Sequence, residues 1–189
     1  KVKARQGIEL VSSGELKVVD DNGIEVAKDG ETLGEITVRG NVVMTGYYND
    51  PESTAAAIKD GWFYTGDAAV VHEDGYLEIR DRFKDVIISG GENISSVEVE
   101  GCLLHHPAVL EVAVVGMPHE KWGEAPHAFV VLQAGKTTNE EELRAHVRSS
   151  LAHFKTPQWF SFVSELPKTA TGKVQKFLLR DGKASISKQ

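Results

Sequence analysis

Apolar and polar side chains alternate with a period of two along much of the first 80 residues, which is the pattern of half-buried β-strands. Turn residues interrupt the pattern, and Asp21-Asn22-Gly23 predicts a hairpin turn because Asn-Gly tolerates positive φ. The strands predicted in this way are residues 16–18, 24–26, 34–40, 69–72 and 76–80. Residues 1–13 are only weakly patterned. The first part of the chain is therefore predicted to be a small, mainly β unit of twisted strands.

One short helix interrupts these strands. Asp50 is a good N-cap, and Pro51 suits the first helical position, where its missing N–H costs nothing. The predicted helix runs from Glu52 to about Lys59, and Asp60-Gly61 ends it.

The chain changes character at Arg80–Asp85, RDRFKD, where all but one of the residues are charged. This segment is too polar for the interior of a sheet, so we predict a domain boundary near Lys84. Residues 1–83 form the β-rich unit, and residues 84–189 form an α/β unit.

In the second unit, short apolar runs typical of strands alternate with segments that have helical periodicity. Residues 109–116 form an apolar strand that is predicted to be buried on both faces apart from Glu111. The other predicted strands are residues 86–88, 127–132 and 159–163, with a turn at Ser89-Gly90-Gly91-Glu92.

Three helices are predicted in this unit. Ser95 and Glu98 form a capping box at the start of a helix that runs to His105, and Thr138–Glu141 repeats the box before a second helix. Apolar residues spaced four apart mark the buried face of the second helix: Leu143, Val147 and Leu151. The third helix closes the chain from Lys173 to Arg180, with Gly182 as its C-terminal cap.

The composition narrows the functional classes. A net charge of −7 gives no case for a general nucleic-acid or anionic-membrane surface. The sequence has no apolar run near the ~20 residues of a membrane span, and KVKARQGIEL lacks the apolar region of a signal peptide. The single cysteine, Cys102, cannot form an internal disulfide and sits among apolar residues, which fits the core of a protein from a reducing compartment. We expect a cytoplasmic location and, since the chain lacks an initiating Met, a fragment.

Several polar residues admit a chemical interpretation beside a purely structural one. Asp67, in Tyr64-Thr65-Gly66-Asp67, is either a turn-capping residue or a carboxylate presented to a vicinal diol such as ribose. Arg82, Lys84 and Asp85 form either a solvated linker or a charged hinge.

Two glycine-containing segments likewise admit both a structural and a chemical interpretation. Gly90-Gly91 is an ordinary tight turn or a place where a ligand chain approaches the backbone closely. Lys173, in PKTATGK, does not complete a P-loop, because Pro167 replaces the first glycine and Val174 replaces the magnesium-binding Ser or Thr. It is either a surface lysine or a point charge for a phosphate or carboxylate. The seven histidines show no metal-ligand spacing, so no metal site is predicted in the chain.

Taken together and in this order, the motifs resemble the adenylate-forming acyl-CoA synthetase superfamily, in the branch that makes CoA thioesters of fatty or aromatic acids. The segments that carry the resemblance are GEITVRGNVVMTGYYNDP, DGWFYTGD, GYLEIRDRFKDVIISGGENISSVEVE, HPAVLEVAVVGMPHEKWGEAPHAFVVL and LPKTATGKVQKFLLR. They cover nearly the whole chain from about Gly34.

The resemblance implies a role for each matching residue. Asp67 would bind the ribose hydroxyls of ATP and of the acyl-adenylate, and Arg82 would contact the nucleotide. Lys84 would be the hinge about which a mobile C-terminal lid rotates between half-reactions. Lys173 would be the catalytic lysine of the lid, bridging the substrate carboxylate and the α-phosphate, where its ammonium offsets the charge that accumulates during adenylation.

The resemblance also implies a CoA site. Gly90, Gly91 and Glu92 would line the tunnel for pantetheine, with Gly91 the position that must stay small. Phe154 and Lys155 lie where related enzymes contact CoA. The lid rotation would open this tunnel over the same adenylate.

The phosphate loop, the magnesium motif and the acyl pocket of the family are absent from this sequence and are expected upstream, so Mg²⁺ is expected to bind there. The cofactors implied are ATP and CoA. The implied partners are a carboxylic acid, the upstream domain of the same protein and a lysine acetyltransferase acting on Lys173, because PKTATGK resembles the substrates of such enzymes. The fragment alone is expected to be inactive.

Three other interpretations remain beside the ligase. Within the superfamily, these are an adenylation domain of a peptide synthetase and, further off, a luciferase-like oxidase. From a different class, the chain could be a non-catalytic module with a relict lid, although the presence of Lys173 and Gly91 argues against it.

Overall fold

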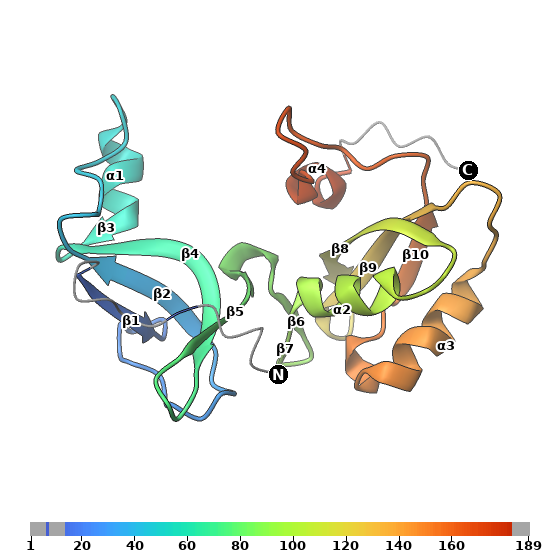
Figure 1. Ribbon diagram of the computed structural model, residues 1–189, viewed down its shortest axis with the longest axis horizontal. Helices are drawn as coiled ribbons and strands as arrows, with labels where there is room; N and C mark the ends of the chain where they lie inside the picture. The colour runs from blue at the N-terminus through green and yellow to red at the C-terminus, as the bar shows by residue number, and fades with distance from the viewer. Residues whose placement is uncertain (1–6, 8–13, 183–189) are drawn as a thin grey trace. The chain divides into compact units, whose positions relative to one another are not determined.

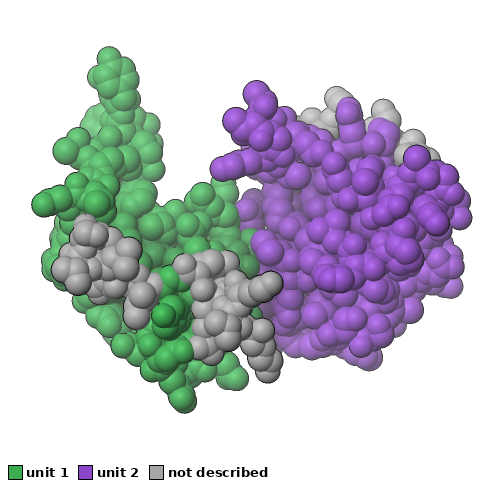
Figure 2. Space-filling view, viewed as in Figure 1, with its two compact units in different colours: residues 1–84 green, residues 85–189 purple. Residues whose placement is uncertain are grey.

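The computed structural model describes residue 7 and residues 14–182, and it divides the chain into two compact units, residues 1–84 and 85–189 (Figures 1 and 2). The division falls between Lys84 and Asp85. Each unit contains its own five-stranded sheet. The weakly patterned residues 1–13 lie outside the described residues, apart from Gly7.

The first unit is an antiparallel sheet in the strand order β1-β2-β4-β3, with β5 also paired to β4. The strands are β1 Glu15–Val19, β2 Gly34–Arg39, β3 Ile58–Lys59, β4 Trp62–Val71 and β5 Leu77–Arg82. Their alternation buries one cluster, in which the buried members are Val18, Ile36, Ala69, Val71 and Leu77.

Helix α1, Pro51–Ala57, follows the predicted signals at its start. The Asp50 side chain accepts a hydrogen bond from the Ser53 backbone N–H, and Pro51 occupies the first turn. The helix ends two residues earlier than predicted, because Ile58 and Lys59 pair with β4 as strand β3. No side chain of α1 is buried.

The predicted hairpin around Asp21-Asn22-Gly23 forms only in part. Gly23 has a φ of +77°, and the Val26 N–H donates to the Val18 carbonyl. Val19 and Glu25 also form an isolated antiparallel bridge, but residues 24–26 are not a strand, and β1 forms its continuous pairing with β2. The predicted neighbour is thus held by a few backbone bonds, whereas β2 offers five consecutive paired positions.

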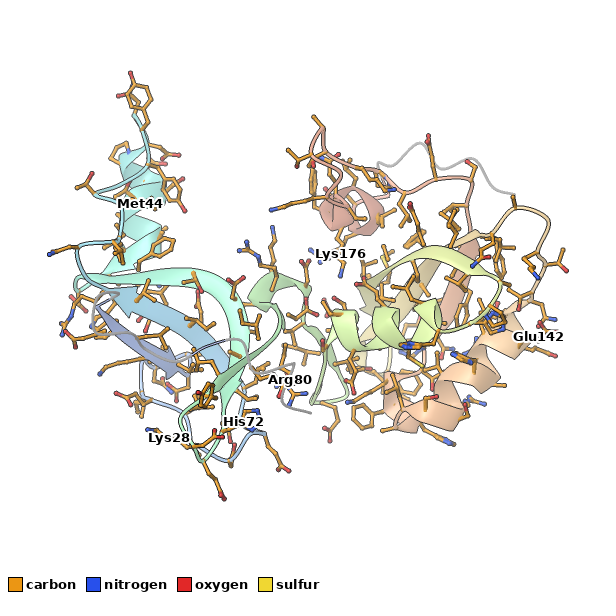
Figure 3. All side chains as sticks on the ribbon, viewed as in Figure 1. Lys28, Met44, His72, Arg80, Glu142 and Lys176 are labelled. Atoms are coloured by element: carbon orange, nitrogen blue, oxygen red, sulfur yellow. The ribbon has the colours of Figure 1, made fainter. Side chains whose placement is uncertain are left out.

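The charged segment Arg80–Asp85 was predicted to lie outside the sheet, and this is wrong for its first half. β5 continues to Arg82, and Asp81 is buried. The alternation of the strand explains this, because Glu78 and Arg80 share one face, where Glu78 contacts both Arg80 and His72 (Figure 3). Paired charges allow a polar strand to remain in the sheet.

The second unit has a sheet in the order β10-β9-β6-β7, with β8 also paired to β9. Strand β10 runs parallel to β9, and the other pairs are antiparallel. The strands are β6 Ile87–Ser89, β7 Glu92–Ile94, β8 Val109–His119, β9 Gly123–Leu132 and β10 Trp159–Phe162; the helices are α2 Ser96–Leu104, α3 Glu140–Ser150 and α4 Lys176–Arg180. Two short 3₁₀ helices, η2 Phe83–Asp85 and η3 His153–Lys155, complete the elements used below.

Both faces of this sheet are covered. Helices α2 and α3 pack Val99, Leu103, Leu143 and Val147 against one face, and α4 packs Leu179 against the other. The prediction that β8 is buried on both faces apart from Glu111 is wrong at Leu110, which is 54% exposed near the start of the strand. The sheet thus has a hydrophobic cluster packed against each of its faces.

Two helix starts differ from the prediction. Asn139, not Thr138, caps α3, and its side chain accepts from the Glu142 N–H. Helix α4 begins at Lys176 rather than Lys173, because Thr169 donates its N–H to the Lys173 carbonyl and holds that residue in a loop. Among the described residues, no helix is long and apolar enough to cross a membrane.

Candidate functional site

Asp67 was predicted to lie in a Gly-Asp turn, but the structure places it inside strand β4. Thr37 pairs with Tyr64 and Glu35 pairs with Ala68, so three residues of β4 face the single residue Ile36. This irregularity is a β-bulge, and Gly66 within it has a φ of +75°, which favours glycine. Bulges commonly redirect side chains beside functional sites.

Asp67, the last residue of the bulge, forms a cross-strand pair with Arg82. The two residues are register partners on β4 and β5, and Asp67 Oδ1 lies 3.0 Å from Arg82 Nε. A second Arg82 nitrogen donates to the Thr65 carbonyl at 3.2 Å. The structure therefore brings together two residues that the sequence singled out separately, and both side chains remain partly accessible.

Lys84 lies in η2 at the end of the first unit and is exposed. The next residue, Asp85, belongs to the second unit and forms an ion pair with Arg180 of α4 at 2.7 Å.

The Gly90-Gly91 segment is the tight turn of the β6–β7 hairpin, as predicted. Both glycines have left-handed φ, +61° and +89°. A Cβ on Gly90 would lie 3.6 Å from the Trp122 ring, whereas a Cβ on Gly91 would meet no atom within 4 Å. Within the second unit, then, backbone conformation rather than crowding favours glycine at position 91.

A cavity of about 350 Å³ lies beside this hairpin in the second unit. Its lining combines the hairpin, the end of β8–β9, helix α3 and η3: Ser89, Gly90, Glu92, Trp122, Ala125, Pro126, Arg144, Arg148, His153, Phe154, Thr156 and Gln158. The mixture of aromatic rings and guanidinium groups suits a ligand with both a planar ring and anionic groups.

Of the CoA residues predicted from the resemblance, Gly90, Glu92 and Phe154 line this cavity. Lys155 does not line it; its ammonium pairs with Glu98 on α2 at 2.6 Å. Gly91 is the next residue of the hairpin.

Sequence reasoning missed the two arginines of α3. Their spacing of four residues, which places them on one helix face, was the available signal. Arg144 is committed to the Pro157 and Gln158 carbonyls and to Glu140. Arg148 has no ion-pair or hydrogen-bond partner within the described part of the chain and is exposed. It is thus a guanidinium available to a ligand.

Lys173 is exposed on the loop before α4. Its backbone is held on both sides, since its N–H donates to Thr169 Oγ1 and its carbonyl accepts from the Thr169 N–H. Gly172 has a φ of +84° in this turn. The Lys173 ammonium has no partner in residues 14–182. A fixed backbone with an unpaired charge is suited to reaching an anion.

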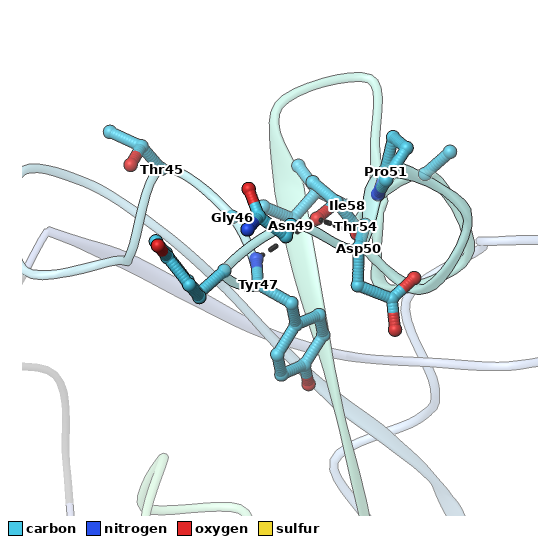
Figure 4. Close-up of a pocket in the computed structure, with 10 residues that line it drawn as sticks. Thr45, Gly46, Tyr47, Asn49, Asp50, Pro51, Thr54 and Ile58 are labelled. Atoms are coloured by element: carbon cyan, nitrogen blue, oxygen red, sulfur yellow. Dashed lines mark hydrogen bonds between the residues drawn. The ribbon is translucent and has the colours of Figure 1, made fainter.

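A separate, shallow hollow of about 740 Å³ lies in the first unit, between the loop around Thr45–Asn49 and α1 (Figure 4). Its internal contacts are structural: the Tyr47 N–H donates to Thr54 Oγ1 at 2.9 Å. None of the predicted site residues lines it.

Two further observations bear on the chemistry. No group of three or more potential metal ligands occurs in the described residues. Burial raises the pKa of the Cys102 thiol, and Glu98 adds to the effect. A raised pKa disfavours the thiolate, which agrees with a structural role for this cysteine.

Residues 98–173 match the family described as the AMP-binding enzyme C-terminal domain. The second unit therefore contains an AMP-binding enzyme C-terminal domain. The matched segment ends at Lys173 and lies within the second unit.

Individual members of the family resemble the whole chain. It is 56% identical over 185 residues to a 2-methylpropanoate–CoA ligase of Humulus lupulus, covering 96% of this chain and 33% of that protein. It is 52% identical over 190 residues to a 4-hydroxybutyrate–CoA ligase of Metallosphaera sedula, covering 100% of this chain and 34% of that protein. The solved O-succinylbenzoate CoA synthetase of Bacillus subtilis, in complex with AMP, matches with a TM-score of 0.83 and 36% identity, covering 98% of this chain and 36% of that one.

The chain thus spans about a third of the length of these relatives. The relatives named here are CoA ligases or synthetases, that is, acid–thiol ligases.

Proposed function

We propose that this chain is the C-terminal third of an ATP-dependent acyl-CoA synthetase, which converts a carboxylic acid, ATP and CoA to acyl-CoA, AMP and pyrophosphate through an acyl-adenylate. Residues 1–83 would end the large AMP-binding domain, and residues 84–189 would form the lid. Support comes from relatives named as CoA ligases along the full length of the chain. The acid is fatty or aromatic in this proposal.

The observation that carries the proposal is the exposure of Lys173 on a loop whose backbone is held by hydrogen bonds. Attack of a carboxylate on the α-phosphorus builds negative charge on the phosphoryl oxygens, and a preorganised ammonium stabilises that charge. Lys173 offers an exposed ammonium without a partner among the described residues, on a loop whose backbone is fixed by Thr169. Little reorganisation is needed before the lysine acts.

Asp67 and Arg82 are assigned to the nucleotide. A carboxylate accepts hydrogen bonds from both hydroxyls of a ribose, and the 3.0 Å pair with Arg82 orients Asp67 for this task. Arg82 retains enough exposure to contact the nucleotide as well. Lys84, beside the boundary between the units, is assigned as the hinge of the lid.

CoA is assigned to the cavity of the second unit. Pantetheine would pass the backbone of Gly90 and Gly91 with Glu92 beside it, and the nucleotide end would meet Phe154 and Trp122. Arg148 is the unpaired cation of the cavity and is suited to a CoA phosphate. Lys155 could join this site only by releasing Glu98, so we rank it below Phe154.

Two parts of the proposal depend on groups beyond these residues. Mg²⁺ would bind in the upstream portion of the enzyme. Acetylation of Lys173 by a lysine acetyltransferase would remove the charge needed for adenylation, and the exposure of Lys173 makes it accessible to such an enzyme.

The test separates the half-reactions in the full-length protein. Lys173→Ala is expected to lower pyrophosphate release, with ATP and a panel of aliphatic and aromatic acids, by about a hundredfold to a thousandfold, the range for removing one transition-state donor. Thioester formation from a supplied acyl-adenylate and CoA should continue, because that step does not use the lysine.

Lys136→Ala is the matched control, since Lys136 is also an exposed loop lysine of the second unit. Unchanged adenylation in Lys173→Ala would refute the assignment of the lysine. Release of pyrophosphate without any CoA thioester would instead identify a different adenylate-forming activity.

A further inference from the structure

Helix α4, which follows the Lys173 loop, needs contacts outside itself to hold its orientation. It has only five residues, Lys176–Arg180, and isolated helices of this length are unstable in water. Leu179 is its one buried residue and packs in the apolar cluster of that sheet face. With only one buried side chain, α4 depends more strongly on the contacts made at its polar ends.

The first residue of α4 is bound to α2. Lys176 Nζ lies 2.7 Å from Glu100 Oε1 and donates to Ser96 Oγ at 2.6 Å (Figure 3). Both charged side chains are largely buried, at 15% and 16% exposure. Glu100 Oε1 also accepts the Val114 N–H of β8 at 2.7 Å. Lys176 thereby attaches the start of α4 to a helix and a strand at once.

The last residue of α4 is bound to the start of the unit. Arg180 donates to Asp85 Oδ1 at 2.7 Å, across 95 residues of sequence. Asp85 is largely shielded, with 12% of its side chain exposed. It directly follows Lys84, the residue assigned above as the hinge. The pair therefore ties the far end of α4 to the residue next to the hinge.

We propose that Lys176 and Arg180 are positioning residues that hold the Lys173 loop in fixed register with the hinge, so that rotation at Lys84 carries the Lys173 ammonium to the α-phosphate. This inference rests on the proposed function and adds to it two residues that act through Lys173 rather than on the substrate. The two ion pairs fix opposite ends of α4, which prevents both sliding and pivoting. Both ion pairs join residues of the second unit, so they move with it as one body. The position of α4 within the lid is therefore the same whichever way the lid faces.

The test compares Arg180→Gln and Lys176→Gln with wild type in the full-length protein. Adenylation, measured as pyrophosphate release with ATP and the best acid of the panel, is expected to fall by about tenfold to a hundredfold, since a misplacement of about 1 Å can cost a hundredfold. The loss should appear in kcat rather than in KM for ATP. Thioester formation from the supplied acyl-adenylate and CoA should stay at the wild-type rate, which also shows that the variants are folded.

A charge reversal provides the rescue. Asp85→Arg alone should lower adenylation as Arg180→Gln does, and Asp85→Arg combined with Arg180→Asp should recover part of the loss. Lys17→Gln is the control, because it breaks an exposed ion pair with Glu25 in the first unit that has no link to α4.

Each outcome separates this inference from the proposed function. If Lys173→Ala abolishes adenylation while Arg180→Gln and Lys176→Gln leave it intact, the positioning role is refuted and the function stands. If both half-reactions fall together and the charge reversal recovers nothing, the ion pairs serve stability alone and the inference is wrong. If Lys173→Ala adenylates normally, the proposed function fails and this inference fails with it.

Discussion

The two sheets of this protein are of equal strand number but are stabilised differently. In the first unit, the described residues form one buried cluster, and the single helix α1 buries none of its side chains. In the second unit, helices cover both faces of the sheet and two clusters form. Burial of apolar surface is the main favourable term in folding. The second unit, with two clusters, therefore gains more of this stabilisation than the first.

The two units also differ in which elements carry the candidate site residues. The first unit presents the Asp67–Arg82 pair on strands, where the backbone of the sheet fixes both residues. The second unit presents Gly90, Gly91 and Lys173 on turns and loops, and Phe154 on the short 3₁₀ helix η3, around its core. Loops held by a rigid scaffold commonly carry binding and catalytic residues.

Separating the units gives the largest expected effect. Residues 85–189 expressed alone should unfold in one cooperative denaturant transition, because both faces of their sheet are covered. Residues 1–84 alone should show no such transition, since one small cluster does not offset the conformational entropy of the chain. Circular dichroism in urea measures both. A cooperative transition in residues 1–84 would remove the contrast between the sheets.

A matched pair of core substitutions sharpens the comparison. Leu143→Ala, at a fully buried position between α3 and the sheet, should cost near the upper end of the usual range of about 2–5 kcal/mol. Leu77→Ala, which is 7% exposed in the smaller cluster, should cost near the lower end. Amide hydrogen exchange followed by mass spectrometry assigns each loss to its unit. Equal losses would show that the smaller cluster is packed as tightly as the larger.

Acid should weaken the units in different pH ranges, which is the smallest expected effect. Hydrogen bonds from Thr32 lower the pKa of Asp29 in the first unit from 3.8 to about 2. A lowered carboxyl pKa stabilises the fold above pH 3.8, and this contribution is lost as the pH falls towards 2.

In the second unit, burial lowers the pKa of His127 below 6.5. Because the unfolded chain then takes up the proton first, this contribution is present above pH 6.5 and is lost as the pH falls through the lowered value. Hydrogen exchange of each unit between pH 7 and pH 4 should therefore show the second unit weakening first. His127→Asn should remove that early loss, and an unchanged profile in this variant would contradict the assignment.

Local signals in the sequence predicted local structure well. Asp50 caps α1, Ser95 accepts from the Glu98 N–H at the start of α2, and Gly90-Gly91 turns between two strands. Each depends on a few neighbouring residues, so the sequence alone was sufficient. The four-residue spacing of Leu143 and Val147 likewise predicted the buried face of α3.

Predictions failed where a distant segment decides the outcome. Gly66-Asp67 reads as a turn, but pairing with β2 converts it to a bulge opposite Ile36. Residues 24–26 read as a strand, but β1 forms its continuous pairing with the more distant β2 and only an isolated bridge with Glu25. In each case the competing hydrogen bonds come from residues whose positions the local pattern does not encode.

The sequence by itself determined which side chains are chemically suited to a site, since the motifs around Asp67, Arg82, Gly91 and Lys173 resemble those of adenylate-forming enzymes. Only the tertiary structure decided which of them meet. It paired Asp67 with Arg82, engaged Lys155 with Glu98, left Arg148 free of partners in the described residues, and joined Arg180 to Asp85. Side-chain chemistry is a property of each residue, whereas an ion pair requires two residues to be brought together by the fold.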